Sequence, residues 1–143
     1  MAIPVPTSVS QDAPNETVVQ RLFHTNRSRK AANLFLRRLI ALNGRMTEVD
    51  MNKFVGDLKS GEFGATLSRG AFYGYILPIF LRQGLIRLGG GFDSTRRKII
   101  PTYFVVVLSV GERAPVKPSL AYNAYILQRA WNQVFSEIVL GGS

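Results

Sequence analysis

The stretch that decides the fold runs from Ser68 to Lys98 and reads SRGAFYGYILPIFLRQGLIRLGGGFDSTRRK. Its first half predicts a helix over 67–83, because apolar residues recur there at helical spacing and a glycine follows. Leu85 to Leu88 then has the composition of a short strand. Gly89–Gly91 and Asp93-Ser94 should form a flexible hairpin tip that leads to the basic run 96–98. We therefore expect a helix followed by a β-hairpin with positive charge near its tip.

One residue inside the predicted helix is incompatible with a regular α-helix. Pro78 has no backbone N–H, and its ring collides with the carbonyl one turn earlier. The helix over 67–83 should therefore be kinked or split into two pieces at this point.

Two shorter helical patterns precede this stretch. The first runs from Arg29 to Leu42, with Ser28 as its expected N-cap, and the second runs from Glu48 to Lys59. Thr47 should cap the second helix, since an acidic residue lies three positions later as in a capping box. Arg45-Met46 has the position of a short strand between the two helices.

The chain therefore divides into four parts. We expect a flexible N-terminal arm over 1–26, which begins poor in packing residues and in which Glu16 to Phe23 could form a short helix with Val19, Leu22 and Phe23 on one side. A folded domain over 27–110 should follow and end with an apolar strand, 99–110. Residues 111–118 hold two prolines and should be a linker, and 119–143 should form a C-terminal helix. The predicted fold class is α+β, mainly α with a small β-hairpin.

Charge points to an anionic partner. The net charge of the 143 residues is +9, and residues 27–98 carry 14 of the 18 basic side chains but only five of the nine acidic ones. Excess positive charge confined to one region favours a phosphate backbone as partner. The alternative is charge that serves solubility alone.

Composition argues against catalysis. The chain has no cysteine and a single histidine, His24, in a segment expected to be mobile, and it contains no phosphate-loop, dinucleotide or zinc motif. We therefore expect no catalytic residue, no metal and no cofactor. The N-terminus does not resemble a secretory signal and the apolar runs are too short to span a bilayer, so we expect a soluble cytoplasmic protein, associated with the nucleoid.

Candidate nucleic-acid contacts occur in three groups. At the start of the helix over 67–83 they are Thr66, Ser68, Arg69 and Tyr73, where a helix in the major groove would present its N-terminal residues to bases. On the hairpin they are Arg96, Arg97 and Lys98, which suit the minor groove or the backbone. Around the first helix they are Arg27, Arg29, Lys30 and Arg37. For each group the alternative is a solvated or merely structural role.

The C-terminal helix carries an apolar seam at alternating spacings of three and four residues. Its members are Leu120, Ala124, Leu127, Trp131, Val134 and Ile138, and Phe135 lies beside them. The seam could pack on its own domain or pair with a second copy of the chain; we expect a homodimer through these seven residues.

Residues 28–108 resemble the winged helix-turn-helix superfamily, in the style of the MarR, PadR and ArsR transcriptional regulators. The resemblance rests on Leu67-Ser68-Arg69, on the run from Phe80 to Arg87 (FLRQGLIR), and on the Gly-rich basic hairpin. It implies contact with double-stranded DNA through Ser68, Arg69 and Tyr73 and through the hairpin arginines. It also implies a dimer formed by terminal helices.

Two functions follow as hypotheses. The first is a non-catalytic, dimeric transcriptional regulator that reads the major groove with helix 67–83 and the minor groove or backbone with the wing over 89–98. The second is a winged-helix protein–protein interaction module within a larger, possibly nucleoprotein, assembly, because fold alone does not fix function.

Overall fold

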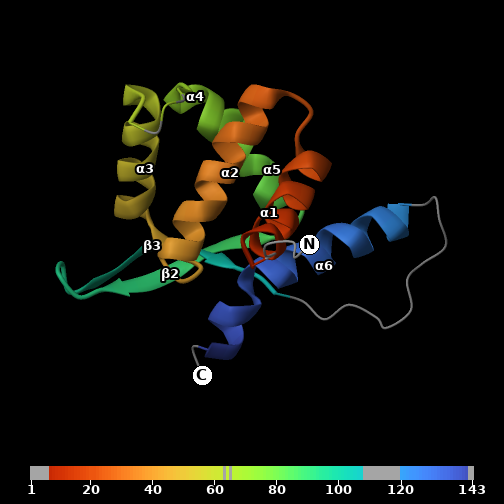
Figure 1. The fold of residues 1–143 in the computed structure, drawn as a ribbon. Helices are drawn as coiled ribbons and strands as arrows, with labels where there is room; N and C mark the ends of the chain where they lie inside the picture. Colours follow the sequence, from red (N-terminus) through yellow and green to blue (C-terminus); the bar gives the residue numbers. More distant parts are fainter. Residues whose placement is uncertain (1–6, 63, 65, 108–119, 142–143) are drawn as a thin grey trace.

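The computed structural model describes residues 7–62, 64, 66–107 and 120–141 (Figure 1). These residues form an α+β fold, as the sequence predicts, with helices packed beside a three-stranded antiparallel sheet. The elements in chain order are α1 (Thr7–Leu22), α2 (Asn26–Ala41), β1 (Arg45–Thr47), α3 (Glu48–Ser60), α4 (Arg69–Ala71), a π-helical turn (Phe72–Ile76), α5 (Leu77–Arg82), β2 (Ile86–Asp93), β3 (Lys98–Val105) and α6 (Leu120–Gly141).

The sheet has the strand order β1-β3-β2. Tyr103 of β3 is opposite Met46 on one side and Leu88 on the other, so β3 is the central strand. The short strand predicted at Arg45-Met46 is thus confirmed. The β2–β3 hairpin extends beyond the helices, and its tip lies far from α6 (Figure 1).

An aromatic cluster holds the helices together. The ring centroid of Phe35 in α2 lies 5.8 Å from that of Phe54 in α3, 5.3 Å from that of Phe72 and 5.2 Å from that of Phe80 in α5. All four side chains are fully buried. Aromatic rings at these separations contribute both buried area and favourable edge-to-face contacts. The cluster therefore fixes α2, α3 and the helical segment 69–82 relative to one another.

The N-terminal region differs from the flexible arm that the sequence suggested. A helix begins at Thr7, and Val18, Leu22 and Phe23 are buried in the core. α1 packs against α6 and α2. The expectation of a flexible arm over 1–26 is therefore wrong for the end of α1, where the apolar side suggested for residues 16–23 is buried in the core.

The predicted helix boundaries are closest to the observed ones where caps are strong. α3 begins at Glu48 behind a complete capping box, in which Thr47 and Asp50 each bond the other's backbone N–H. α2 begins three residues earlier than predicted, since Thr25 and not Ser28 is its N-cap. The Oγ1 atom of Thr25 accepts a hydrogen bond from the Ser28 backbone N–H at 3.1 Å.

The helix predicted over 67–83 is interrupted. It begins at Arg69, passes through the π-helical turn Phe72–Ile76 and continues as α5, with Pro78 in the first turn of α5. Pro78 cannot donate to the preceding turn, and a wider turn there makes room for its ring. The predicted disturbance at Pro78 is thus confirmed, in the form of a π turn within a continuous helical path.

The triple glycine is not the hairpin tip. Gly89, Gly90 and Gly91 lie within β2 and pair with residues 100–102 of β3, while residues 94–97 form the turn. A Cβ atom on Gly91 would stand 2.6 Å from Thr102 Oγ1, and one on Gly90 would stand 2.7 Å from a methyl carbon of Ile99. These glycines therefore permit close packing within the sheet, where the sequence suggested turn flexibility.

The C-terminal helix packs on its own domain. Leu127, Trp131 and Phe135 are buried, and the indole N–H of Trp131 donates to the Val106 carbonyl oxygen at 2.9 Å. The dimer interface expected through these three side chains is wrong, because the core of a single chain already covers them. Of the other four seam residues, Ala124 is exposed and Val134 is half-buried, while the side chains of Leu120 and Ile138 lie outside the described residues.

The predicted linker over 111–118 also lies outside the described residues. Among the helices that are described, none is both long enough and apolar enough to cross a membrane.

Candidate nucleic-acid interface

The N-terminal end of the helical segment 69–82 is joined to α3 by a three-residue cluster. Asn52 Oδ1 accepts hydrogen bonds from Arg69 Nη2 and from the Tyr73 hydroxyl, each at 3.2 Å. The Arg69 guanidinium carbon lies 5.0 Å from the centroid of the Tyr73 ring. Arg69 and Tyr73 therefore share one face of the helix, as their spacing predicts. We call Asn52, Arg69 and Tyr73 the Asn52 cluster.

Asn52 is a residue that sequence reasoning missed. It lies on the exposed side of α3, and its only sequence signal is a polar residue beside the apolar stripe of that helix. Its proximity to Arg69, 17 positions later, depends on how α3 and α4 cross, which the aromatic core fixes.

The Tyr73 phenol is held in its neutral form. Partial burial raises the pKa of Tyr73 above its ordinary value, the positive charge of Arg69 opposes this rise, and the negative charge of Glu48 adds to it. A neutral phenol keeps its O–H as a donor to Asn52. The cluster therefore presents a guanidinium, an aromatic ring and amide N–H donors at the end of the helix.

Ser68 and Thr66 precede this cluster. The Ser68 hydroxyl accepts a hydrogen bond from the Ala71 backbone N–H at 3.1 Å and so caps α4. Thr66 is exposed, and its carbonyl oxygen accepts a bond from Arg27 Nε at 3.3 Å. The structural role that the sequence allowed for Ser68 is thus present.

The hairpin lies next to the cluster. Arg69 and Tyr73 share a hollow of about 280 Å³ with Leu88, Pro101 and Tyr103 of the hairpin. Glu48, Met51 and Asn52 of α3 complete its wall. The N-terminal end of the helical segment and the base of the hairpin therefore border one surface.

The hairpin tip is basic and ordered by one carboxylate. Asp93 accepts hydrogen bonds from the Thr95 and Arg96 backbone N–H groups, and its other oxygen pairs with Arg96 Nη1 at 3.0 Å. Lost hydration alone would raise the pKa of Asp93, but the bonds from Arg96 and Thr95 outweigh it and the pKa is lowered. Arg96, Arg97 and Lys98 are all exposed.

Two further arginines lie on the sheet and were not predicted as site residues. The guanidinium carbons of Arg87 and Arg45 lie 4.8 Å and 5.8 Å from the centroid of the Phe104 ring. Arg87 alternates with Leu88 along β2, so these two side chains project from opposite faces of the hairpin. The face of the hairpin that carries Phe104 is therefore positively charged. The hollow lies on the opposite face, with Leu88 and Tyr103.

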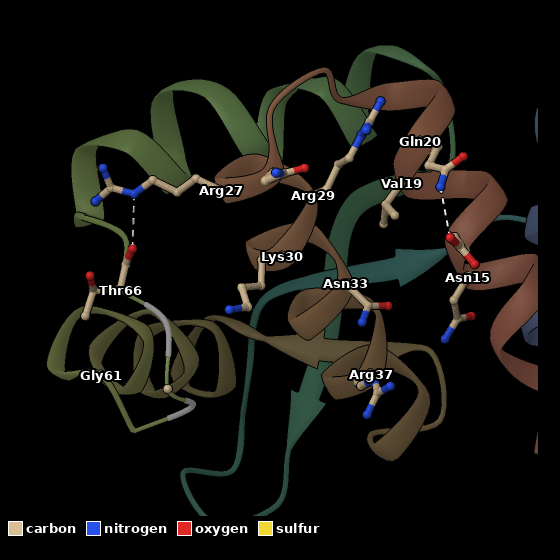
Figure 2. Close-up of a pocket in the computed structure, with 13 residues that line it drawn as sticks. Asn15, Val19, Gln20, Arg27, Arg29, Lys30, Asn33, Arg37, Gly61 and Thr66 are labelled. Carbon is tan, nitrogen blue, oxygen red and sulfur yellow. Dashed lines mark hydrogen bonds between the residues drawn. The ribbon is translucent and has the colours of Figure 1, made fainter.

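The basic residues of α2 gather elsewhere. Arg27, Arg29, Lys30 and Arg37 line an open groove, together with residues of α1 and with Gly61, Gly64 and Thr66 (Figure 2). No residue lines both this groove and the hollow beside the Asn52 cluster. The group of candidate contacts around the first helix thus lies apart from the group that lines the hollow.

Comparison with known proteins gives no match: no protein-family model matches the chain, and no curated protein or solved structure is significantly similar to it. Within the described part of the chain, no group of three or more histidine, aspartate or glutamate side chains is placed to hold a metal ion.

Proposed function

We propose that this chain is a winged-helix protein that binds double-stranded DNA without catalysis. The order of elements supports this proposal, since α2, β1, α3, the helical segment 69–82, β2 and β3 follow one another as a helix-turn-helix with a wing does. The strand order β1-β3-β2 is compatible with it.

The Asn52 cluster is the observation that carries the proposal. A guanidinium held by a hydrogen bond and by an aromatic ring loses little side-chain entropy when it binds. Arg69 is exposed at the N-terminal end of its helix, where a helix in the major groove brings side chains to base edges. In this proposal Arg69 contacts a guanine or a phosphate, and Thr66 and Ser68 contact the backbone beside it.

The hairpin supplies the second contact. Arg96, Arg97 and Lys98 are exposed on the elongated hairpin beyond the helices. Arginines on such a hairpin suit a narrow minor groove or the phosphates that flank it. Asp93 holds the turn in place, and Arg96 exchanges this carboxylate for a phosphate when DNA is bound.

Arg69→Gln tests the proposal in a fluorescence-anisotropy titration of a random-sequence duplex. Arg82→Gln is the matched control, because it removes the same charge from the exposed other end of the helical segment. We expect Arg69→Gln to weaken binding by about tenfold, in line with the 1–3 kcal/mol of a good contact, and Arg82→Gln to leave it nearly unchanged. Equal effects of the two variants would refute a specific role for the cluster.

A second candidate function rests on the apolar face of the hairpin. Leu88, Phe92 and Ile99 are 55%, 56% and 66% exposed, and the register places them on one face. Contiguous exposed apolar side chains favour a protein-docking surface. The double variant Phe92→Ser/Ile99→Ser distinguishes the two functions. If DNA is the partner, the variant binds a duplex as well as the unchanged protein does. If this face carries the function, any self-association of the protein seen by sedimentation velocity disappears in the variant.

A further inference from the structure

The outer side of β2 is an open strand edge. In the described part of the chain the sheet ends at β2, so only one side of this strand is paired. Leu88, Gly90 and Phe92 of β2 are exposed, and the hairpin extends beyond the helices (Figure 1). An unpaired edge offers a row of backbone N–H and C=O groups to another strand.

The backbone groups of alternate residues point outward along this edge. The Val106 N–H donates to the Leu85 carbonyl oxygen at 2.8 Å, so Leu85 directs its backbone groups toward β3. The pairing of β2 with β3 continues from there without a shift in register. Because alternate residues of an antiparallel strand face opposite sides, Leu88, Gly90 and Phe92 direct their backbone groups to the outer edge.

Arg45 touches this edge without closing it. Its Nη2 atom donates to the Phe92 carbonyl oxygen at 3.2 Å. A carbonyl oxygen has two lone pairs, so it can accept a second hydrogen bond from another strand. The Arg45 contact also fixes the backbone of β2 near the end of the strand.

The two edges of the sheet differ in their protection. Edge strands are usually short, or carry lysine, proline or a bulge, which discourages further pairing. β2 reads IRLGGGFD over Ile86–Asp93 and has none of these features. On the other side, β1 covers residues 102–104 of β3, and Pro101 beside them has no N–H to donate. Only the β2 edge is therefore suited to accept a further strand.

The strand that complements this edge is β2 of a second copy. In an antiparallel pair centred on Gly90, Leu88 lies opposite Phe92 of the second copy, and Arg87 lies opposite Asp93 of the second copy. Two-fold symmetry repeats both pairs. Each exposed apolar side chain then meets an apolar one and each charge meets its opposite, and cross-strand pairs of both kinds stabilise a sheet.

Other symmetric registers fit this strand less well. A pairing centred on Gly89 sets Arg87 opposite Gly91 of the second copy, and Phe92 opposite Ile86, whose side chain is already buried. A pairing centred on Gly91 shortens the overlap of the two strands. The register between these two is therefore the one that pairs both the charges and the apolar side chains.

We propose that this chain forms a symmetric dimer in which the β2 strands of two copies pair antiparallel along residues 87–93. The pairing joins the two sheets into one, over a length of about 24 Å. It names the partner of the exposed apolar face that supports the second candidate function, and it does not depend on DNA binding. Arg96 and Arg97 lie in the hairpin turn, outside the paired residues.

Sedimentation velocity of the whole chain at about 5–500 μM tests the dimer in the absence of DNA. We expect a monomer–dimer equilibrium with a dissociation constant of about 1–100 μM, because one strand pair buries a modest area. A chain that stays monomeric over this range would overturn the proposal. Such a result would leave the duplex titrations as a separate test of the proposed function.

Phe92→Lys and Ile99→Lys distinguish pairing at the edge from docking on the apolar face. Both positions are exposed on the same face, but Phe92 lies on the edge strand and Ile99 on the central one. We expect Phe92→Lys to weaken dimerisation by at least about tenfold, and Ile99→Lys by no more than about threefold. Equal losses would contradict pairing through the edge.

Arg87→Glu tests the charge pairs of the proposed register. It sets a like charge opposite Asp93 of the second copy at two places in the dimer, so dimerisation should weaken by about tenfold. Lys53→Glu makes the same change of charge at an exposed position of α3 and should leave dimerisation unchanged. An Arg87→Glu variant that dimerises as well as the Lys53→Glu variant would contradict the register.

Engineered cysteines test the register directly, because the chain has no cysteine of its own. In the proposed dimer, position 88 of one copy lies about 5.5 Å from position 92 of the other, between Cα atoms, which suits a disulfide. Identical positions lie more than about 12 Å apart. A mixture of the single variants Leu88→Cys and Phe92→Cys should therefore form cross-linked dimers under mild oxidation, and neither variant alone should do so. Cross-links within either variant alone, or none in the mixture, would overturn this register.

Discussion

Asn52 shows how one exposed side chain can orient two neighbours. A single amide oxygen accepts from both Arg69 and Tyr73, and the Arg69 guanidinium also stacks on the Tyr73 ring. All three side chains are at least partly exposed, so these bonds add little to the stability of the fold. Their effect is on where the guanidinium points.

Asn52→Ala should therefore reduce duplex affinity more than stability. We expect a several-fold loss in anisotropy titrations, because Arg69 then samples more rotamers, and a change in unfolding free energy below about 1 kcal/mol. Tyr73→Phe keeps the ring under Arg69 and should show a smaller loss. An Asn52→Ala variant with wild-type affinity would contradict the proposed orientation of Arg69.

Gly91 and Gly56 form a matched pair that tests the role of glycine in the hairpin. Thr102 is fully buried and its hydroxyl is bonded to the Ile100 carbonyl, so it cannot move away from a Cβ on Gly91. Gly91→Ala should destabilise the protein by about 1–3 kcal/mol in urea unfolding. Gly56→Ala meets open space on α3 and should stabilise it by up to about 1 kcal/mol. Equal effects at both positions would contradict the packing role of Gly91.

Among the elements, α6 is the one whose role is decided by tertiary contacts. Trp131 is the chain's only tryptophan, and its ring centroid lies 4.6 Å from that of Phe135 and 5.9 Å from that of Phe80. Its indole N–H is satisfied by the Val106 carbonyl oxygen. α6 therefore ties the end of β3 to the helical core.

Trp131→Ala should cost about 3–5 kcal/mol of unfolding free energy, as expected for removal of a large buried ring. Arg129→Ala, on an exposed position of the same helix, should change it by no more than about 0.5 kcal/mol. Urea unfolding followed by circular dichroism measures both. If Trp131→Ala left stability unchanged but dissociated a dimer, α6 would be an intermolecular element and the packing described above would be incorrect.

The sequence predicts the elements better than their contacts. The capping box of α3, the short strand at Arg45 and the disturbance at Pro78 are local signals, and each is confirmed. The apolar sides of α1 and α6 are local patterns, but the sequence does not say that these two helices pack against each other. The triple glycine was misread, because turn chemistry and close packing within a sheet both select glycine.

The candidate site was predictable only in part, for the same reason. Helical spacing placed Arg69 and Tyr73 on one face. Asn52 bonds both of them only because α3 and α4 cross, and the sequence does not predict that crossing. Clustering in sequence set Arg27, Arg29, Lys30 and Arg37 apart as a group around the first helix, but it did not predict the surroundings of that group. The structure places them in a groove that residues of α1 and Gly61, Gly64 and Thr66 also line.

Over the whole molecule, positive charge is divided between two places. The Asn52 cluster and the hairpin tip make the proposed DNA-binding surface, and Arg27, Lys30 and Arg37 line the groove beside α2. Polyanions bound through lysine and arginine release counterions, so duplex binding should depend on salt in proportion to the phosphates contacted.

The most direct measurement is the affinity for a random-sequence duplex as a function of salt concentration. With about four cations in contact, we expect the logarithm of the association constant to fall with a slope of about −3 to −4 against the logarithm of salt concentration. Arg96→Gln with Arg97→Gln should make that slope shallower by about 2. Absence of binding at about 50 mM salt, or a slope that the hairpin variant leaves unchanged, would contradict the proposal that this chain binds DNA through a basic wing.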